Sequence, residues 1–431
     1  MLARGLGRAI LHLQTHDAIP YRDTILHACT HFVGYDVQTD PSRARYNFDL
    51  ITQGGDRDWY LPRLYHAFAT GEDVEMPIQL FNLMGFLAQD GNTLARMMMY
   101  DNFAEDAPEL DTTGADVLVD LDGLAGYVFV ARQWIKHPLP EDDQWEEDVL
   151  LDTVEERFGA DAVTAALAAT MDENVNEGAD LSVYLAQVRE RRRLDKANQP
   201  KRPQFPVPDY ETVRGIVDKP LGRSGQYLLR RAGRFADDAL LSRVAGELDA
   251  ETDPARVLHL LYFFGWAVFP LPPHRLLALA QSGDQDTAFA ARAALAHVTH
   301  PDVRAFALAQ MDTGNVRYLV DMLQMNPAEE DYALMAALTQ RPLSADEFHH
   351  AGMSILDYVK THPSPQAVPA LLGVYENGLC AFCRSSVVDS LAALTPLPQA
   401  IEREIAWDAS PDTRTYAAFF GSPNSDGQGL A

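Results

Sequence analysis

The sequence predicts an all-α protein, an α-solenoid built from antiparallel helix pairs. Helix-period spacing of apolar residues recurs from end to end of the 431 residues, whereas the alternation that is typical of strands is nearly absent. The stretch Asp286–Met322 contains three short Ala- and Leu-rich helices in direct succession, each introduced by a turn residue. Such short helices cannot bury their apolar faces alone, so we expect them to stack on their neighbours.

Residues 1–194 are expected to form an N-terminal domain of irregular helix pairs. Gly- and Asp-rich turns at 54–56, 71–73 and 90–92 separate its apolar runs. The predicted helices are Tyr21–Val33, Arg43–Thr52, Trp59–Ala69, Ile78–Ala88, Thr93–Phe103, Ala115–Ile135, Trp145–Phe158, Ala160–Met171 and Leu181–Leu194.

A proline-rich segment marks the clearest boundary. Residues 198–208 carry four prolines, each of which removes a backbone donor and disfavours helical conformation in the residue before it. We therefore assign residues 195–210 to a basic linker or surface strap, 211–420 to a C-terminal repeat domain, and the Gly- and Ser-rich residues 421–431 to a disordered tail.

Helix pairs are more regular in the C-terminal domain. Most of its helices follow Asp, Ser, Thr or Pro, the residues favoured at helix starts, and every second start recurs after roughly 30 residues. The predicted helices are Ser224–Leu248, Pro254–Phe269, Pro273–Ser282, Thr287–Val298, Asp302–Met311, Val316–Met325, Ala328–Thr339, Ala345–Lys360, Pro365–Tyr375, Cys380–Leu394, Leu397–Trp407 and Pro411–Phe419.

One of these pairs carries a family resemblance. Asp-Val-Arg at 302–304 follows a His-Pro turn and precedes a helix with small residues along one side, a pattern that resembles HEAT repeats over Thr252–Phe419. The segments 35–38, 42–44, 121–124 and 380–384 also resemble an uncharacterised group of bacterial HEAT-repeat proteins. The resemblance implies an armadillo-like, right-handed superhelix of helix pairs and carries no activity with it.

Composition limits the classes of partner. The chain has 35 Lys and Arg residues against 62 Asp and Glu residues, a net charge of −27, which repels phosphate backbones at long range.

Three cysteines cannot form a disulfide framework, so we expect a reducing, cytoplasmic location. We expect no secretory signal and no membrane partner, because the longest apolar stretch, Leu258–Leu271, is too short to span a bilayer.

Charge is nevertheless segregated along the chain. Residues 189–234 contain 13 Lys and Arg residues against five acidic residues, a net charge of +8, whereas residues 101–180 have a net charge of −19. The basic segment could dock on the acidic half of the same chain, bind an anionic partner such as RNA, DNA or an acidic protein face, or simply be solvated. The candidate residues are Arg191, Arg192, Arg193, Lys201, Arg202, Arg230 and Arg231.

Two motifs could carry chemistry. Asp120 and Asp122 follow an apolar run as in haloacid-dehalogenase-type phosphotransferases, but Leu124 replaces the expected Thr and the surrounding pattern favours a helix. Cys380 and Cys383 form a Cys-x-x-Cys motif that would need two further ligands to hold zinc. We therefore expect the two cysteines to be packing residues, and we expect no catalytic residue, metal or other cofactor.

The sequence thus predicts a non-enzymatic scaffold or adaptor that binds another protein, one with a basic face, in the concave groove of the stack. Two alternatives remain. One is a nucleic-acid-binding or DNA-repair protein that uses residues 189–234, similar in architecture to alkylpurine DNA glycosylases. The other, less favoured, is a metal- or phosphate-dependent enzyme.

Overall fold

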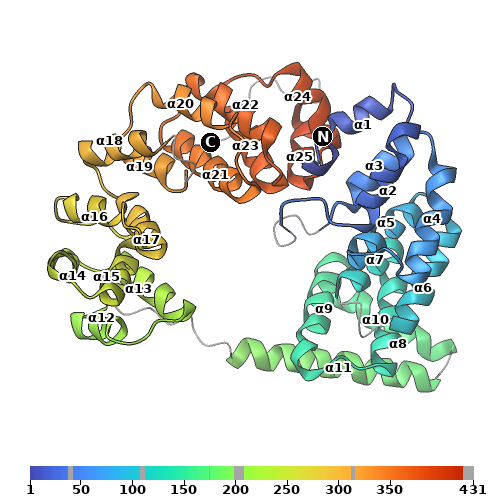
Figure 1. The fold of residues 1–431 in the computed structure, drawn as a ribbon. Coiled ribbons are helices and arrows are strands. Elements are labelled where there is room, and N and C mark those ends of the chain that lie inside the picture. Colours follow the sequence, from blue (N-terminus) through green and yellow to red (C-terminus); the bar gives the residue numbers. More distant parts are fainter. Residues whose placement is uncertain (37–41, 107–111, 174, 199–207, 312–315, 421–431) are drawn as a thin grey trace. The chain divides into compact units, whose positions relative to one another are not determined.

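The computed structural model describes residues 1–36, 42–106, 112–173, 175–198, 208–311 and 316–420. Every regular element within these ranges is a helix, so the predicted all-α class is confirmed (Figure 1). No helix in the described part of the chain is long and apolar enough to cross a membrane.

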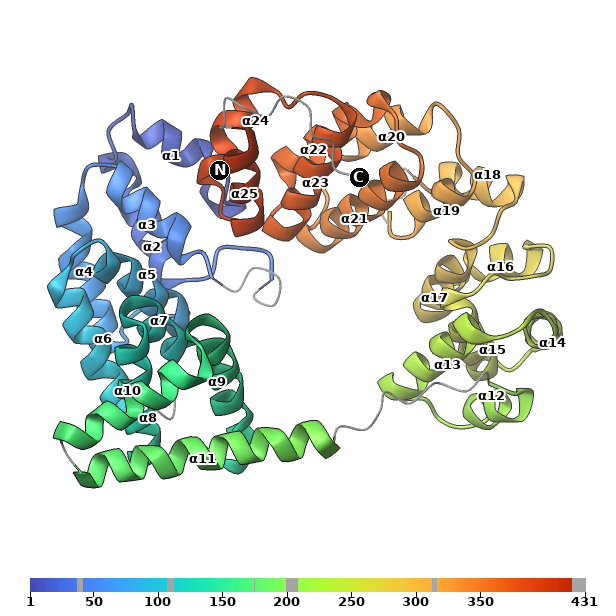
Figure 2. The same ribbon diagram turned by 180° about the vertical axis from the view of Figure 1, so that it is seen from behind.

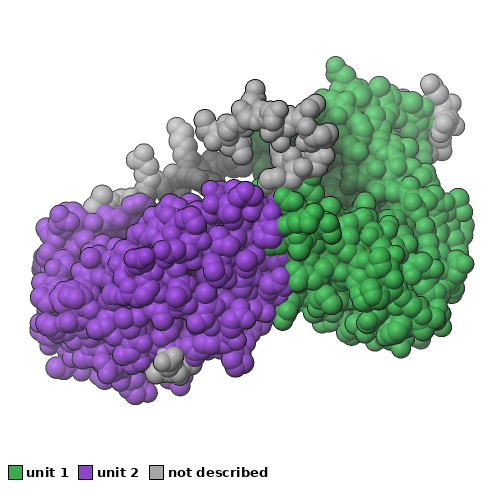
Figure 3. Space-filling model, turned by 90° about the horizontal axis from the view of Figure 1, so that it is seen from above, with its two compact units in different colours: residues 1–201, 399–431 green, residues 202–398 purple. Residues whose placement is uncertain are grey.

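The chain forms two compact units (Figure 3). Unit 1 comprises Met1–Lys201 and Gln399–Ala431, and unit 2 comprises Arg202–Pro398. The first boundary falls within the predicted 195–210 linker, although residues 195–198 are helical and 199–207 lie outside the described ranges. The second boundary differs from the predicted 211–420 domain, because the chain returns to unit 1 at Gln399. The predicted tail, 421–431, also lies outside the described residues.

In unit 1 most helices pack on the next but one. α3, α5, α7 and α9 follow one another in this way, as do α4 and α6 and also α8 and α10, while α11 covers α8, α9 and α10. The helices are α1 (Arg8–Leu13), α2 (Arg22–Thr30), α3 (Ala44–Gln53), α4 (Arg57–Thr70), α5 (Pro77–Gln89), α6 (Thr93–Asp106), α7 (Thr112–Asp122), α8 (Leu124–Lys136), α9 (Trp145–Phe158), α10 (Ala160–Glu173), α11 (Val175–Asn198), α24 (Gln399–Glu404) and α25 (Pro411–Phe420).

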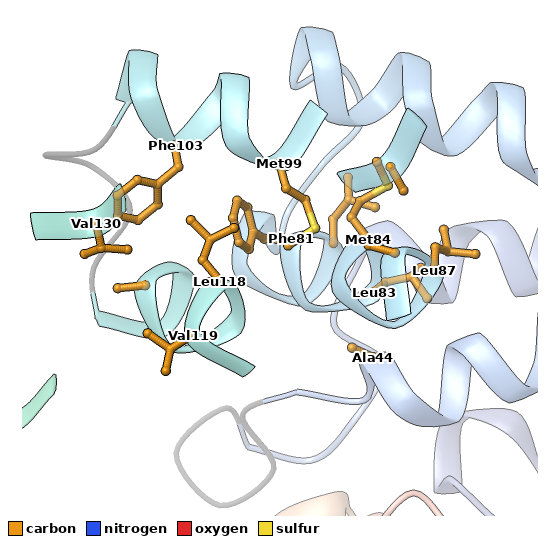
Figure 4. Close-up of a cluster of buried hydrophobic side chains, with 14 of the residues drawn as sticks. Ala44, Phe81, Leu83, Met84, Leu87, Met99, Phe103, Leu118, Val119 and Val130 are labelled. Atoms are coloured by element: carbon orange, nitrogen blue, oxygen red, sulfur yellow. The ribbon is translucent and has the colours of Figure 1, made fainter. Parts of the chain in front are cut away.

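One continuous apolar core holds these helices together. Phe81 and Met84 of α5, Met99 of α6 and Leu118 of α7 are all fully buried and point toward one another (Figure 4). The predicted helix Ala115–Ile135 is divided into α7 and α8 at Gly123, whose φ of 60° lies in the left-handed region that favours glycine.

The C-terminal helices complete unit 1 by packing on its N-terminus (Figure 1, Figure 2). The amide of Ala409 donates a hydrogen bond to the carbonyl oxygen of Gly5 at 2.9 Å. Arg8 of α1 pairs with Glu404 of α24 at 2.6 Å, and the Glu404 side chain is only 2% exposed. A Cβ atom at Gly7 would lie 1.9 Å from the Glu404 carbonyl oxygen, so this close approach requires glycine. These long-range contacts explain why residues 399–420 leave the predicted C-terminal domain.

Unit 2 shows the same alternation. α13, α15 and α17 pack in succession, as do α19, α21 and α23, and α20 packs on α22. The predicted helix Ser224–Leu248 is two helices, because Asp237 caps a new one by accepting from the Leu240 amide. The helices are α12 (Tyr210–Val217), α13 (Arg223–Phe235), α14 (Asp238–Ala250), α15 (Pro254–Phe263), α16 (His274–Leu279), α17 (Gln285–Leu295), α18 (Pro301–Gln310), α19 (Leu319–Met325), α20 (Asp331–Leu338), α21 (Ala345–Thr361), α22 (Val368–Asn377) and α23 (Ala381–Leu394), with a 3-10 turn η4 (Phe264–Trp266) after α15.

Candidate functional site

The arginines of α11 are bound within unit 1. Nη2 of Arg191 lies 2.7 Å from a Glu147 carboxylate oxygen, 2.8 Å from Asp148 and 3.0 Å from the Gln144 carbonyl oxygen. Nε also donates to Asp148 at 3.1 Å, and Nη1 donates to the Gln144 side chain at 3.2 Å. The Glu147 side chain is only 7% exposed. Burial raises the pKa of Glu147 more than the hydrogen bond from Arg191 lowers it. The basic helix thus docks on the acidic start of α9, which is one of the three outcomes that the charge segregation allows.

Arg192 continues this pairing one turn further along α9. It pairs with Glu155 at 2.8 Å and also with Asp152, while Arg189 reaches Glu155 at 2.7 Å. Burial opposes the ionisation of Glu155, but the hydrogen bonds from Arg192 and Arg189 outweigh burial and lower the pKa of this carboxyl. Acidic residues spaced by one helical turn on α9 therefore face the arginines of α11.

The other predicted residues of this segment have different surroundings. Arg193 is exposed and, among the described residues, forms an ion pair only with Glu190 of its own helix, at 2.7 Å. Lys201 and Arg202 lie outside the described residues. Arg230 and Arg231 are half-buried on α13 in unit 2.

α13 exposes one sector that mixes arginines with large apolar side chains. Positions separated by three, four, seven or eight residues share a face of a helix, and the buried residues Leu229, Ala232 and Gly233 occupy the opposite side. We call the outward sector the α13 face. Its residues are Arg223, Tyr227, Leu228, Arg231, Arg234 and Phe235.

The exposed apolar surface extends from α13 onto η4. The rings of Tyr227 and Trp266 meet edge to face with centroids 5.8 Å apart, and they are 50% and 40% exposed. Gly233 permits this arrangement, because a Cβ atom there would lie 1.8 Å from the Phe263 carbonyl oxygen. Val268, which is 56% exposed, continues the surface two residues after Trp266. Exposed apolar groups gathered in this way are typical of binding surfaces.

A groove of about 450 Å³ begins at Val268. Its walls come from the turn that follows η4, the end of α17 and the end of α19. The lining residues are Val268, Phe269, Pro270, Leu271, Pro272, Pro273, His297, Val298, Thr299, His300 and Met325. We take the α13 face, Trp266 and this groove together as a candidate interaction surface of unit 2.

Two arginines of the α13 face, Arg223 and Arg234, are exposed. Among the described residues, no carboxylate lies within ion-pair distance of Arg223 or Arg234, and both side chains are exposed. Arg230, beside the face, lies 5.5 Å from the centroid of the Tyr262 ring, a cation–π contact. The α13 helix itself carries four arginines and no acidic residue, in a chain whose net charge is −27.

The two chemical motifs lie elsewhere. Asp120 and Asp122 lie on a helix, α7, and not on a strand, and they pair with Arg157 and Arg96 at 2.6 Å each. The phosphotransferase motif requires its aspartates to follow a strand. Asp120 and Asp122 lie on a helix and form ion pairs there, so their surroundings do not match that motif.

Cys380 and Cys383 are buried at the start of α23, and His349 of α21 lies beside them. Hydrogen bonding with Cys380 and burial raise the pKa of the Cys383 thiol. The sequence offered no local signal for His349 as a neighbour of these thiols.

Sequence reasoning also missed Tyr227, Trp266 and Val268. The α13 face could have been found from the Tyr, Leu and Phe residues that recur with helical spacing among its arginines. Trp266 could not, because its position beside Tyr227 depends on the packing of η4 against α13. In comparisons with known protein families, curated proteins and solved structures, nothing matches this chain.

Proposed function

We propose that this protein is a non-enzymatic scaffold of HEAT-like helix pairs that binds another protein. The packing of many helices on the next but one supports the repeat architecture, since a stack of helix pairs produces this alternation. The exposed basic and aromatic surface around α13 supports the binding role, because arginines and aromatic rings are enriched where proteins recognise partners.

The single observation that carries the proposal is the α13 face. Tyr227, Leu228 and Phe235 expose apolar surface to solvent, and burying this surface against a partner would be favourable. Arg223 and Arg234 place positive charge beside it. The partner segment complementary to such a surface is acidic and carries Leu or aromatic side chains. Over the rest of the surface, the net charge of −27 favours a partner with a basic face at long range. The proposed partner is a protein that presents an acidic, apolar-containing segment to α13.

Nucleic acid is the competing occupant of the same surface. Exposed Tyr227 and Trp266 could stack on bases, and the arginines could pair with phosphates. A long polyanion, however, meets the repulsion of the whole chain, whereas a short acidic peptide segment carries only a few charges. The observations favour protein over nucleic acid.

The test measures binding of fluorescent peptides and oligonucleotides to the full chain. A set of acidic peptides with interspersed Leu and Phe residues, a basic set of the same apolar pattern, and single-stranded DNA and RNA are compared at two salt concentrations by fluorescence polarisation. We expect the acidic, apolar-containing peptides to bind best and Trp266→Ala to weaken them about tenfold, the effect of removing a central aromatic anchor.

Trp145→Ala is the matched control, because Trp145 is 55% exposed on α9 in unit 1. This substitution is expected to leave peptide binding unchanged. Equal losses in the two variants would remove the α13 face as the binding surface. Salt-sensitive oligonucleotide binding that exceeds peptide binding and depends on Trp266 would replace the protein-binding role with the nucleic-acid alternative.

A further inference from the structure

Three metal-binding side chains meet between α21 and α23 in unit 2. His349 lies on the second turn of α21, Cys380 is the N-cap of α23 and Cys383 lies one turn inside that helix. One ligand atom from each of the three lies within 4.8 Å of the other two. Among the described residues no other group of three such side chains is so arranged. This cluster does not belong to the α13 face or to its groove.

The spacing of these atoms suits a tetrahedral zinc ion. With Zn–S bonds of about 2.3 Å and a Zn–N bond of about 2.05 Å at the tetrahedral angle, sulfur and nitrogen lie about 3.6 Å apart. The Cys383 Sγ to His349 Nδ1 distance is 3.6 Å. Binding would therefore need little movement of this pair. Two thiolates and one imidazole are also the donor types that zinc prefers, and a water molecule can take the fourth position.

The surroundings of the cysteines include groups that stabilise thiolates, the form that binds metal. The Cys383 amide donates to Cys380 Sγ at 3.4 Å. Both sulfur atoms lie at the N-terminus of the 14-residue helix α23, where the helix dipole is positive. Arg384 follows directly and is 1% exposed, which places a buried positive charge beside the sulfur atoms. Without metal, the pKa of the Cys383 thiol remains raised, because the hydrogen bond with Cys380 and burial have a larger effect than Arg384. The positive charge of a bound metal ion would favour the thiolate over the thiol.

A disulfide and simple packing are the two competing states. A Cys-x-x-Cys pair at a helix start could form a disulfide, which would make no use of the imidazole. In the packed state the contact between Cys383 Sγ and His349 Nδ1, 3.6 Å apart, is a hydrogen bond, and zinc would replace this hydrogen bond with a bond to each of the two atoms. The sequence alone favours packing, because it shows only two of the ligands that zinc needs. The fold supplies a third from α21.

We propose that His349, Cys380 and Cys383 bind one Zn²⁺ ion that joins α21 to the start of α23. On binding, the two thiols lose their protons to solvent and each sulfur atom donates an electron pair to the metal, so no oxidant or reductant is needed. The consequence is structural: the ion links two successive helices of one layer in unit 2.

Metal analysis of the full chain, purified under reducing conditions and incubated with ZnCl₂ before desalting, tests the site. We expect about one zinc ion per chain, the stoichiometry of one three-residue site. Cys380→Ser/Cys383→Ser and His349→Ala are expected to lose it. Cys29→Ser, which removes a buried cysteine of unit 1, and His350→Ala, which removes the adjacent imidazole, are expected to keep it.

Cobalt provides a measurement that does not depend on the folding of any variant. Co²⁺ added to the wild-type chain is expected to give thiolate-to-metal charge-transfer absorption and the intense visible bands of a tetrahedral site, and zinc is expected to displace both. Wild-type protein that retains no zinc and shows no cobalt–thiolate bands would overturn the proposal. So would zinc that persists in the double cysteine variant. Metal-free protein in which the pair oxidises to a disulfide, leaving one free thiol of the three that the chain contains, would also overturn it.

Discussion

The arginines of α11 and those of α13 belong to one basic stretch of the sequence, yet their surroundings are opposite. Arg191 and Arg192 donate to carboxylates of α9, and one of these, Glu147, is only 7% exposed. Arg223 and Arg234 are exposed beside Tyr227, and within the described residues no carboxylate pairs with them. The arginines of α11 therefore pair with carboxylates within unit 1, whereas Arg223 and Arg234 of α13 remain exposed. A charge count along the sequence cannot distinguish these two kinds of surroundings.

The largest expected effect comes from Gly233→Ala, which would disrupt the close packing of α13 against α15. The added Cβ would lie 1.8 Å from the Phe263 carbonyl oxygen, a backbone atom that cannot easily move away. We expect the free energy of unfolding of unit 2 to fall by about 3 kcal/mol, at the upper end of the cost of overpacking. Denaturant unfolding and hydrogen exchange in α13 and α15 measure the effect.

Gly246→Ala is the control for this prediction. Gly246 lies on α14, and a Cβ atom added there would have no neighbouring atom within 4 Å, so alanine is expected to stabilise the helix by about 0.5–1 kcal/mol. If both substitutions change the stability of unit 2 equally, the close approach of α13 to α15 is not what positions Tyr227 beside Trp266.

Arg191→Ala tests the other half of the comparison. Removing this guanidinium leaves the buried Glu147 carboxylate its hydrogen bond with Tyr184 but takes away the charge of Arg191, and we expect unit 1 to lose about 2 kcal/mol of unfolding free energy. The value lies below that of a fully buried pair because Arg191 is partly exposed and solvent screens it. Hydrogen exchange in α9 and α11 should show the loss directly.

Arg193→Ala serves as the matched substitution on the same helix. Arg193 is 65% exposed and pairs only with Glu190, so the stability of unit 1 should hardly change. Comparable losses for Arg191→Ala and Arg193→Ala would show that docking on α9 contributes nothing specific.

Arg234→Glu should separate recognition from stability. We expect the affinity for acidic, apolar-containing peptides to fall about tenfold, because one attractive charge becomes repulsive at the edge of the binding surface. Thermal unfolding should be nearly unchanged, since Arg234 is exposed and forms no ion pair within the described residues. A variant that unfolds earlier but binds normally would assign Arg234 the structural role of the α11 arginines.

The smallest effect concerns pH. The pKa of Glu155 is lowered in the folded state, so its stabilising contribution is full above its ordinary value of 4.5 and is lost as the pH falls through the lower folded-state pKa. Glu155→Gln should therefore reduce the acid sensitivity of unit 1.

The pKa of Glu147 is raised in the folded state, so protonation of Glu147 at low pH favours the folded state. Glu147→Gln removes this contribution and should increase the acid sensitivity of unit 1. Unfolding of unit 1 followed from about pH 6 to about pH 3 tests both signs, and equal responses would contradict the pairing described for α9 and α11.

Local features of the fold were predictable because local chemistry produces them. Asp253, Asp284 and Ser344 cap helices close to the predicted starts, each accepting from an amide three residues later. The two predicted helices that proved to be divided, at Gly123 and at Asp237, contain residues that end or start helices, and helical periodicity alone did not reveal them.

The candidate sites were only partly predictable. Charge segregation allowed the pairing of Arg191 and Arg192 with the acidic half as one of three outcomes, because segregation is a property of composition. The contact of Tyr227 with Trp266 and that of His349 with Cys383 could not be predicted from composition, because each depends on how separate helices pack.

The sequence by itself determined that this chain is helical, where most of its helices begin, and that its basic and acidic residues are segregated. Helical periodicity and capping act over a few residues, so they can be recognised without knowledge of the fold. Only the tertiary structure decided which arginines are neutralised, which imidazole lies beside the cysteines, and that α24 and α25 pack on α1. Arg8 and Glu404 are 396 positions apart, and their contact depends on the path of the whole chain between them. Contacts of that kind are selected by the complementary shape and charge of packed surfaces, which no local pattern encodes.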